Sequence, residues 1–160
     1  MADSPSGRDE TENERLDRNL SEMLGELRVA LPGVQVLFAF LLVVPFSNRF
    51  ADVTAFEKNV YFVTLLCAAA ASVCLIAPTV QHRIEFRHQD KEHIVLVSNK
   101  LAILGLGFLA IAMTGAILFV TDFLFGTATT VVASAFVALS FALLWYAIPL
   151  RRLRERHRHD

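Results

Sequence analysis

Apolar residues are gathered into four long runs along the chain, and charged residues are confined to the segments between and beyond them. The first run, residues 29–46, lies between Arg28 and Arg49 and contains no ionisable side chain. Because a helix needs roughly 17–25 apolar residues to cross about 30 Å of hydrocarbon, this run predicts a membrane-spanning helix. Similar runs predict three further spanning helices, at residues 59–80, 101–120 and 127–150. The pattern therefore predicts an all-α integral membrane protein in which four spanning helices form a bundle.

The segments that flank this membrane domain, residues 29–150, are polar. Residues 1–13 contain Pro and Gly among charged side chains and predict a disordered tail, while residues 151–160 form a basic tail. In residues 14–28, Leu and Met recur at helical spacing between Glu, Asp and Arg, which predicts an amphipathic cytoplasmic helix. This helix either lies on the membrane surface as the lead-in to the first span or is a partner-binding or self-association helix. Its acidic face is unusual for binding anionic lipid and favours packing against a basic connection.

That basic connection, residues 81–100, mixes charged and apolar side chains. It predicts either helical extensions of the second and third spans or an interfacial hairpin. Pro32 is expected to open the first spanning helix, because proline lacks an N–H and is tolerated in the first turn. The prolines expected to close the first, second and fourth helices are Pro45, Pro78 and Pro149.

Small side chains recur along the predicted spans, most densely at residues 67–72. They let helix backbones approach closely in lipid, where little hydrophobic force acts between helices. We expect them to pack helices together, within one chain or in a homo-oligomer. The predicted packing residues are Ala68, Ser72, Gly107, Gly115, Ser134, Ala138 and Ala142.

Positive charge is divided unequally between the two sides of the predicted membrane domain. Thirteen of the fifteen Lys and Arg residues lie before the first span, in the 81–100 connection or after the fourth span, and the other side carries only Arg49 and Lys58. The positive-inside rule therefore predicts that both termini are cytoplasmic. The residues predicted to orient the chain and contact lipid headgroups are Arg28, Arg83, Arg87, Lys91, Arg151, Arg152 and Arg154.

Composition agrees with a membrane protein and offers little chemistry. The chain is 54% hydrophobic and 19% charged, whereas soluble domains are roughly 45–50% apolar and about 25% charged. Cys67 and Cys74, about 10 Å apart along one helix, are predicted to be free thiols. The chain carries no phosphate-binding loop, nucleophile elbow or catalytic acid pair, so we predict no enzymatic activity, no cofactor and no nucleic-acid partner.

The histidine-rich connection contains candidate metal ligands. His82, Glu85 and His88 could share one helical face. With His93 they could ligate zinc, which commonly takes His and carboxylate ligands. The spacing matches no HExxH motif, so the sequence predicts no metal site.

Polar side chains inside the spans are the remaining candidates for a functional site. An ion or proton transporter is expected to carry ionisable residues within the membrane, and no predicted span has one at its middle. We expect Gln35 to hydrogen-bond a neighbouring helix and the hydroxyls to bond carbonyls of their own helix. The candidate polar membrane site comprises Gln35, Thr64, Ser72, Thr114 and Asp122.

Two segments carry a resemblance to a known family: E-L-R-V-A-L-P-G-V-Q-V-L-F-A-F-L at residues 26–41 and H-R-I-E-F-R-H at residues 82–88. Together with the later spans they resemble a bacterial family of small four-span membrane proteins known as a domain of unknown function, from about Glu12 to Arg152. The resemblance implies a multi-pass protein of the bacterial plasma (inner) membrane. Some members bear the label sodium:proton antiporter, and the resemblance implies no catalytic set of residues.

Three functions follow as hypotheses. The leading one is a non-enzymatic membrane scaffold or interaction protein, oligomeric through its small-residue faces. The alternative is a small cation or proton transporter, as the family label implies. A third is a membrane anchor that recruits a cytosolic or membrane protein partner through residues 12–28.

Overall fold

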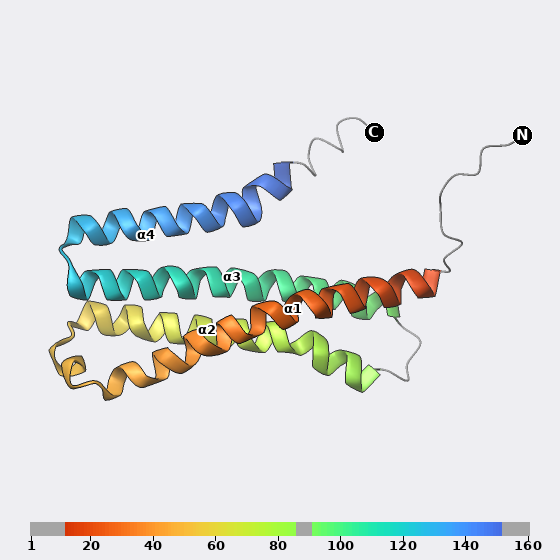
Figure 1. Ribbon diagram of the computed structural model, residues 1–160, viewed down its shortest axis with the longest axis horizontal. Helices are drawn as coiled ribbons and strands as arrows, with labels where there is room; N and C mark the ends of the chain where they lie inside the picture. Colours follow the sequence, from red (N-terminus) through yellow and green to blue (C-terminus); the bar gives the residue numbers. More distant parts are fainter. Residues whose placement is uncertain (1–11, 86–90, 152–160) are drawn as a thin grey trace, which may run out of the picture.

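The computed structural model describes residues 12–85 and 91–151, and these residues form a bundle of long helices (Figure 1). Helices long and apolar enough to cross a membrane cover Ser21–Phe46, Ala55–Gln81, Ile94–Leu124 and Thr127–Arg151. The predictions of an all-α fold and of four spanning helices are therefore confirmed. In chain order the elements are α1 (Glu12–Val43), the 3-10 helices η1 (Val44–Phe46) and η2 (Asn48–Asp52), α2 (Ala55–Glu85), α3 (Lys91–Leu124), α4 (Thr127–Phe141) and the π-helix η3 (Ala142–Ala147).

The N-terminal segment and the first span form one continuous helix, α1. Pro32 lies inside it, so the prediction that this proline opens the first spanning helix is wrong. An interior proline removes one backbone hydrogen bond, a loss that packing can offset in spanning helices. Leu27 and Val34, on either side of Pro32, are both buried in one core cluster with residues of α2 and α3. This packing stabilises the helical conformation before and after the proline, so residues 14–28 are not a separate element.

The second and third helices are also longer than predicted. α2 continues through Pro78 to Glu85, so the prediction that Pro78 closes the helix is wrong. Its side chain is fully buried, and close packing against the rest of the bundle accommodates it. Residues 81–85 and 91–100 are helical extensions of α2 and α3, as one of the two alternatives for this connection proposed. Residues 86–90 lie outside the described residues.

The other two prolines differ from each other. α1 ends at Val43, and Pro45 follows within η1, as predicted. Pro149, expected to close the fourth helix, lies instead in a helical turn at residues 148–151 that continues η3.

α2 begins at Ala55 because Thr54 and Glu57 form a capping box. The Glu57 carboxylate accepts hydrogen bonds from the Thr54 backbone N–H and hydroxyl, both at 2.7 Å. The Glu57 backbone N–H in turn donates to Thr54 Oγ1 at 3.2 Å. These bonds satisfy N–H groups that have no partner within the helix. The helix therefore starts four residues before the predicted position of residue 59.

α2 and α3 pack closely along their length. In α2 the buried positions alternate at intervals of four and three, and they are Glu57, Tyr61, Thr64, Ala68, Ala71, Leu75 and Pro78. This 3.5-residue period is typical of left-handed, coiled-coil-like packing. Two glycines of α3 permit the approach: a Cβ added to Gly115 would overlap the Thr64 hydroxyl, and one added to Gly105 would lie 2.7 Å from Leu75 Cγ.

α1 completes a three-helix core by crossing α2 and α3 (Figure 1). Its inward residues Leu27, Val34 and Leu41 recur every seven positions, and all three are buried. The Tyr61 hydroxyl donates to the Leu41 carbonyl at 3.0 Å and ties the end of α1 to α2. Both hydrophobic core clusters draw their buried residues from the chain before α4, chiefly from α1, α2 and α3.

α4 lies outside this core, beside α3 (Figure 1). Among the described elements its backbone approaches only α3 and its own continuation η3. Thr130 and Ser134 are its two buried residues. Only 6% of the apolar stretch of this span is buried inside the structure, compared with 28% for the spans of α2 and α3.

Candidate functional site

The residues of the predicted polar membrane site do not converge. Thr64, Ser72 and Thr114 each donate a hydroxyl hydrogen bond to the carbonyl four residues earlier in the same helix, at 2.7, 3.0 and 2.8 Å. Gln35 is exposed on the surface of α1, and Asp122 is half-buried near the end of α3. Three of the five side chains therefore have their hydroxyls satisfied by their own helices, and a fourth, Gln35, faces outward.

The predicted packing residues fall into two groups. Ala68 is fully buried and Ser72 half-buried within α2, and Gly115 lies against Thr64. Gly107 faces the other way, toward the fourth helix, where a Cβ would meet the Tyr146 hydroxyl at 3.0 Å. These residues do bring helices together within one chain.

The predicted packing residues on the fourth helix differ in burial. Ser134 is buried toward α3, and its hydroxyl has no hydrogen-bond partner among the described residues. Ala138 and Ala142 are exposed among the described residues.

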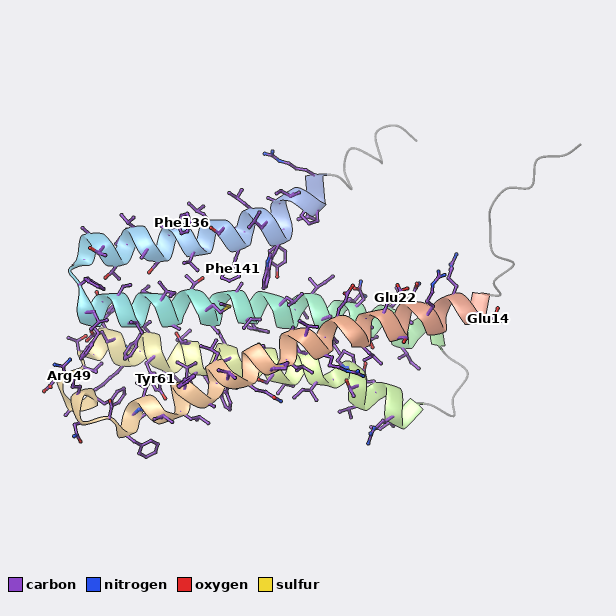
Figure 2. The ribbon with its side chains drawn as sticks, in the orientation of Figure 1. Glu14, Glu22, Arg49, Tyr61, Phe136 and Phe141 are labelled. Atoms are coloured by element: carbon purple, nitrogen blue, oxygen red, sulfur yellow. The ribbon has the colours of Figure 1, made fainter. Side chains whose placement is uncertain are left out.

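The predicted orienting cations that the structure describes are exposed. They are Arg28 in α1, Arg83 in α2 and Arg151 after η3. Arg49 lies at the opposite end of the bundle from Glu14 (Figure 2), and its guanidinium stands 6.0 Å from the Phe123 ring centroid. Arg87, Arg152, Arg154 and the side chain of Lys91 lie outside the described residues.

The histidine cluster also falls largely outside the description, since neither His88 nor the side chains of His82, Glu85 and His93 are described. Within the described part of the chain, no group of three or more His, Cys, Asp or Glu side chains could hold a metal ion. Cys67 and Cys74 are free, half-buried thiols, as the sequence predicts.

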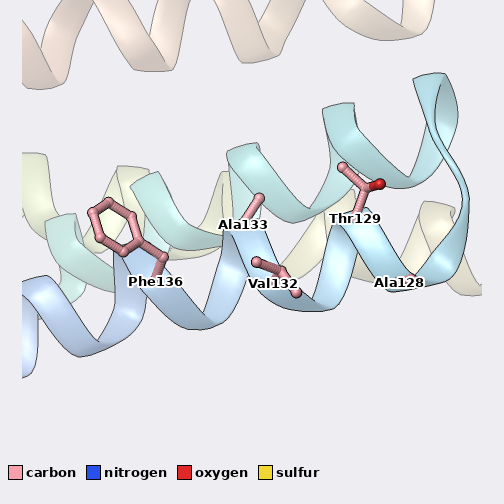
Figure 3. Close-up of a pocket in the computed structure, with 5 residues that line it drawn as sticks. All are labelled: Ala128, Thr129, Val132, Ala133 and Phe136. Carbon is pink, nitrogen blue, oxygen red and sulfur yellow. The ribbon is translucent and has the colours of Figure 1, made fainter.

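A shallow, open hollow lies along the surface of α4 (Figure 3). It has a volume of about 550 Å³ and is lined by Ala128, Thr129, Val132, Ala133 and Phe136. Three of these five residues are small. Thr129 and Ala133, four positions apart, form a small-xxx-small pair of the kind that lets a second helix approach closely.

Phe136 is the large side chain at the edge of this hollow. It is 72% exposed and projects from α4, whereas Phe141 lies on the side of the helix that faces α3 (Figure 2). A large side chain therefore stands directly beside small residues on one outward surface. We name the five residues that line the hollow the α4 face and take it as the candidate site.

The sequence contains signals for some of these features and not for others. Thr54-x-x-Glu57 is a capping-box pattern and could have located the start of α2. The sequence does not distinguish Thr129 and Ala133, because α4 carries several small-residue pairs and spacing alone does not determine which pair faces outward. That choice depends on how α4 is rotated against α3.

Comparison with known proteins places the chain in a family. Residues 9–149 match a family of unknown function, DUF6328. The chain belongs to that family. A search of curated proteins found no match, and neither did a search of solved structures. The family relationship together with the four apolar helices identifies a small multi-pass membrane protein in contact with the lipid bilayer.

Proposed function

We propose that this DUF6328 member is a non-enzymatic membrane interaction protein that pairs with a second copy of itself through the α4 face. The observation that carries the proposal is the hollow beside Phe136, on a helix that contributes little to the core of its own chain. The hydroxyls of Thr64, Ser72 and Thr114, which the sequence offered as a polar site, are instead bonded to carbonyls of their own helices.

The proposed pairing follows from the symmetry of membrane insertion. Two copies in one membrane share one orientation, so their α4 helices run parallel and are related by a two-fold axis along the membrane normal. In such a pair the same surface patch lies on both sides. Phe136 of each copy would then occupy the hollow beside Ala133 of the other, as a knob enters a hole between packed helices.

The matched test compares two phenylalanines of nearly equal exposure. Phe136 is 72% exposed on α4, and Phe40 is 70% exposed on α1. We expect Phe136→Ala to lower dimer formation in liposomes by roughly tenfold or more, since hot-spot truncation costs about 2 kcal/mol. Phe40→Ala is expected to leave it unchanged. Förster transfer between labelled copies, measured at several protein-to-lipid ratios, gives the association constant.

A second variant fills the hollow. Ala133→Leu is expected to weaken the pair, while Ala39→Leu on the exposed surface of α1 is the matched control. Wild-type protein that stays monomeric at every ratio would contradict the proposal. So would a loss of pairing caused by Ala138→Leu and Ala142→Leu but not by Ala133→Leu, because the interface would then lie on the other flank of α4.

We further propose that both termini are cytoplasmic in a bacterial inner membrane. The start of α1 and the end of the described chain point toward the same end of the bundle (Figure 1). The end of α2, which carries Arg83, and the start of α3, which precedes Lys100, point the same way. Positive residues flanking spans are retained on the cytoplasmic side. A reporter fused after Asp160 is expected to be active in the cytoplasm, and activity on the outside would reverse the assignment.

Cation or proton transport is the competing function. It predicts that reconstituted protein dissipates a sodium or proton gradient and that Gln35→Leu abolishes this activity. That outcome would refute the interaction proposal, because Gln35 lies on the surface of α1 and is not part of the α4 face.

A further inference from the structure

The α3–α4 contact opens at the end of the fourth helix. Over Ala142–Ala147 the chain forms the π-helix η3, a form that occurs mostly as short insertions and frequently at functional sites. The backbone of η3 does not come within 8 Å of α3, measured between Cα atoms, whereas that of α4 does. The end of the fourth helix therefore leaves a groove beside α3.

Tyr146 crosses this groove. Its hydroxyl donates a hydrogen bond to the Ile103 carbonyl at 3.4 Å and lies against Gly107. Trp145 is positioned by an edge-to-face contact with Phe141, with ring centroids 4.8 Å apart. Both aromatic side chains thus have defined places at the groove.

A cavity of about 260 Å³ lies in the groove, lined by Ile103, Leu106, Trp145 and Tyr146. The lining is apolar apart from the Tyr146 hydroxyl and the Trp145 indole N–H. Pockets for drug-sized ligands measure roughly 300–1,000 Å³. This cavity is smaller, so it suits part of a hydrocarbon chain rather than a whole ligand.

Two cations stand at the same end of the groove. Lys100 precedes Ile103 by one turn of α3, and Arg151 follows Tyr146 at the end of the fourth helix. Both are exposed, and neither pairs with a carboxylate among the described residues. The two helix segments that line the cavity thus each carry, a few residues further along, a cation that is not paired among the described residues.

We propose that this groove binds one anionic glycerophospholipid. The upper part of an acyl chain occupies the cavity, and the phosphate lies between Lys100 and Arg151. Basic pockets between spanning helices are suited to anionic headgroups, and Trp and Tyr favour the depth at which headgroup and acyl chain meet. A free phosphate would use the cations and leave the cavity unfilled, so the joint arrangement selects a lipid. The groove is separate from the α4 face, so this inference does not depend on self-association.

The single tryptophan of the chain makes the test direct, because Trp145 lines the cavity. Phospholipids brominated on the upper acyl chain quench indole fluorescence on contact. The protein is reconstituted in phosphatidylcholine bilayers that contain brominated phosphatidylglycerol or, in parallel, brominated phosphatidylcholine at the same mole fraction. We expect the anionic lipid to quench Trp145 well beyond its mole fraction.

Charge variants locate the site. Each cation near the membrane surface favours an anionic lipid about fivefold, so Lys100→Gln or Arg151→Gln is expected to reduce the preference about fivefold and the double variant to abolish it. Arg49→Gln with Lys58→Gln, at the other end of the bundle, is the matched control and is expected to keep it. Equal quenching by both lipids in the wild type would overturn the proposal, as would a preference that survives the double variant. Soluble phosphate that displaces the brominated lipid would also overturn it, by showing that the anion alone is bound.

Discussion

α3 packs against α2 on one side and against α4 on the other, and the two contacts differ in kind. On the α2 side, Gly105 and Gly115 lie so close to Leu75 and Thr64 that an added methyl group would overlap them. On the α4 side, a Cβ at Gly107 would meet only the end of a tyrosine side chain, at 3.0 Å. In the first contact two backbones approach closely at glycine residues of α3, whereas the second is bridged by the Tyr146 side chain at its open end.

The comparison shows that hydrophobicity does not determine which helices form the core. The spans of α2 and α4 have similar mean hydropathy, 2.4 and 2.2. In lipid, helix association depends on close van der Waals packing and hydrogen bonds, because hydrocarbon solvates apolar side chains as well as another helix does. α2 places Thr64 and Leu75 directly against glycines of α3, whereas α4 buries only Thr130 and Ser134. The fourth helix therefore keeps much of its surface exposed, where another molecule can bind.

The largest expected difference between the two contacts is the cost of removing a leucine. Leu75 is fully buried in the core, and Leu139 is 60% exposed on α4. Leu75→Ala is expected to lower the free energy of unfolding by about 2–5 kcal/mol, because it leaves a cavity. Leu139→Ala is expected to change it by less than about 0.5 kcal/mol. Unfolding in mixed micelles with increasing sodium dodecyl sulfate, followed by circular dichroism, measures both; equal losses would show that α4 belongs to the core.

Two glycine substitutions test how closely α2 and α3 approach each other. Gly115→Ala places a methyl group against the Thr64 hydroxyl and is expected to cost about 1–3 kcal/mol through overpacking. Gly33→Ala, in α1, meets no atom within 4 Å and is expected to be neutral or to stabilise the helix by up to about 1 kcal/mol. The same unfolding assay in mixed micelles measures the stability of both variants. If Gly115→Ala were as neutral as Gly33→Ala, the α2–α3 contact would be looser than described.

The smallest expected effect on stability comes from removing a tyrosine hydroxyl that donates a hydrogen bond to a helix carbonyl. Tyr61 is buried and bonds the Leu41 carbonyl at 3.0 Å, while Tyr146 is half-buried and bonds the Ile103 carbonyl at 3.4 Å. Tyr61→Phe is expected to cost about 1 kcal/mol of global stability, and Tyr146→Phe at most about 0.5 kcal/mol.

Hydrogen exchange separates these two variants. Tyr146→Phe is expected to speed amide exchange in residues 142–148 and leave α2 unchanged, because the bond joins only the end of the fourth helix to α3. Faster exchange throughout α2 in this variant would mean that the fourth helix supports the core.

Much of the architecture was predictable from particular residues. The uncharged run after Arg28 and its three successors predicted four spanning helices, and the structure confirms them. The prolines did not mark the helix ends reliably, since Pro32 lies inside α1 between the buried residues Leu27 and Val34, and Pro78 is itself buried inside α2. Proline preference is a local property, and tertiary packing outweighs it at both positions.

The candidate site was predictable only in outline. Small residues on α4 were expected to pack, yet Ser134 faces α3 while Ala138 and Ala142 remain exposed, and the hollow formed by Thr129 and Ala133 was not anticipated. The sequence by itself determined how many times the chain crosses the membrane, because hydrocarbon thickness sets a length and excludes charge. Only the tertiary structure decided which small residues are buried between α2 and α3 and which face outward on α4. That outcome depends on the rotation and register of each helix against its neighbour, which a period of 3.6 residues along one helix does not specify.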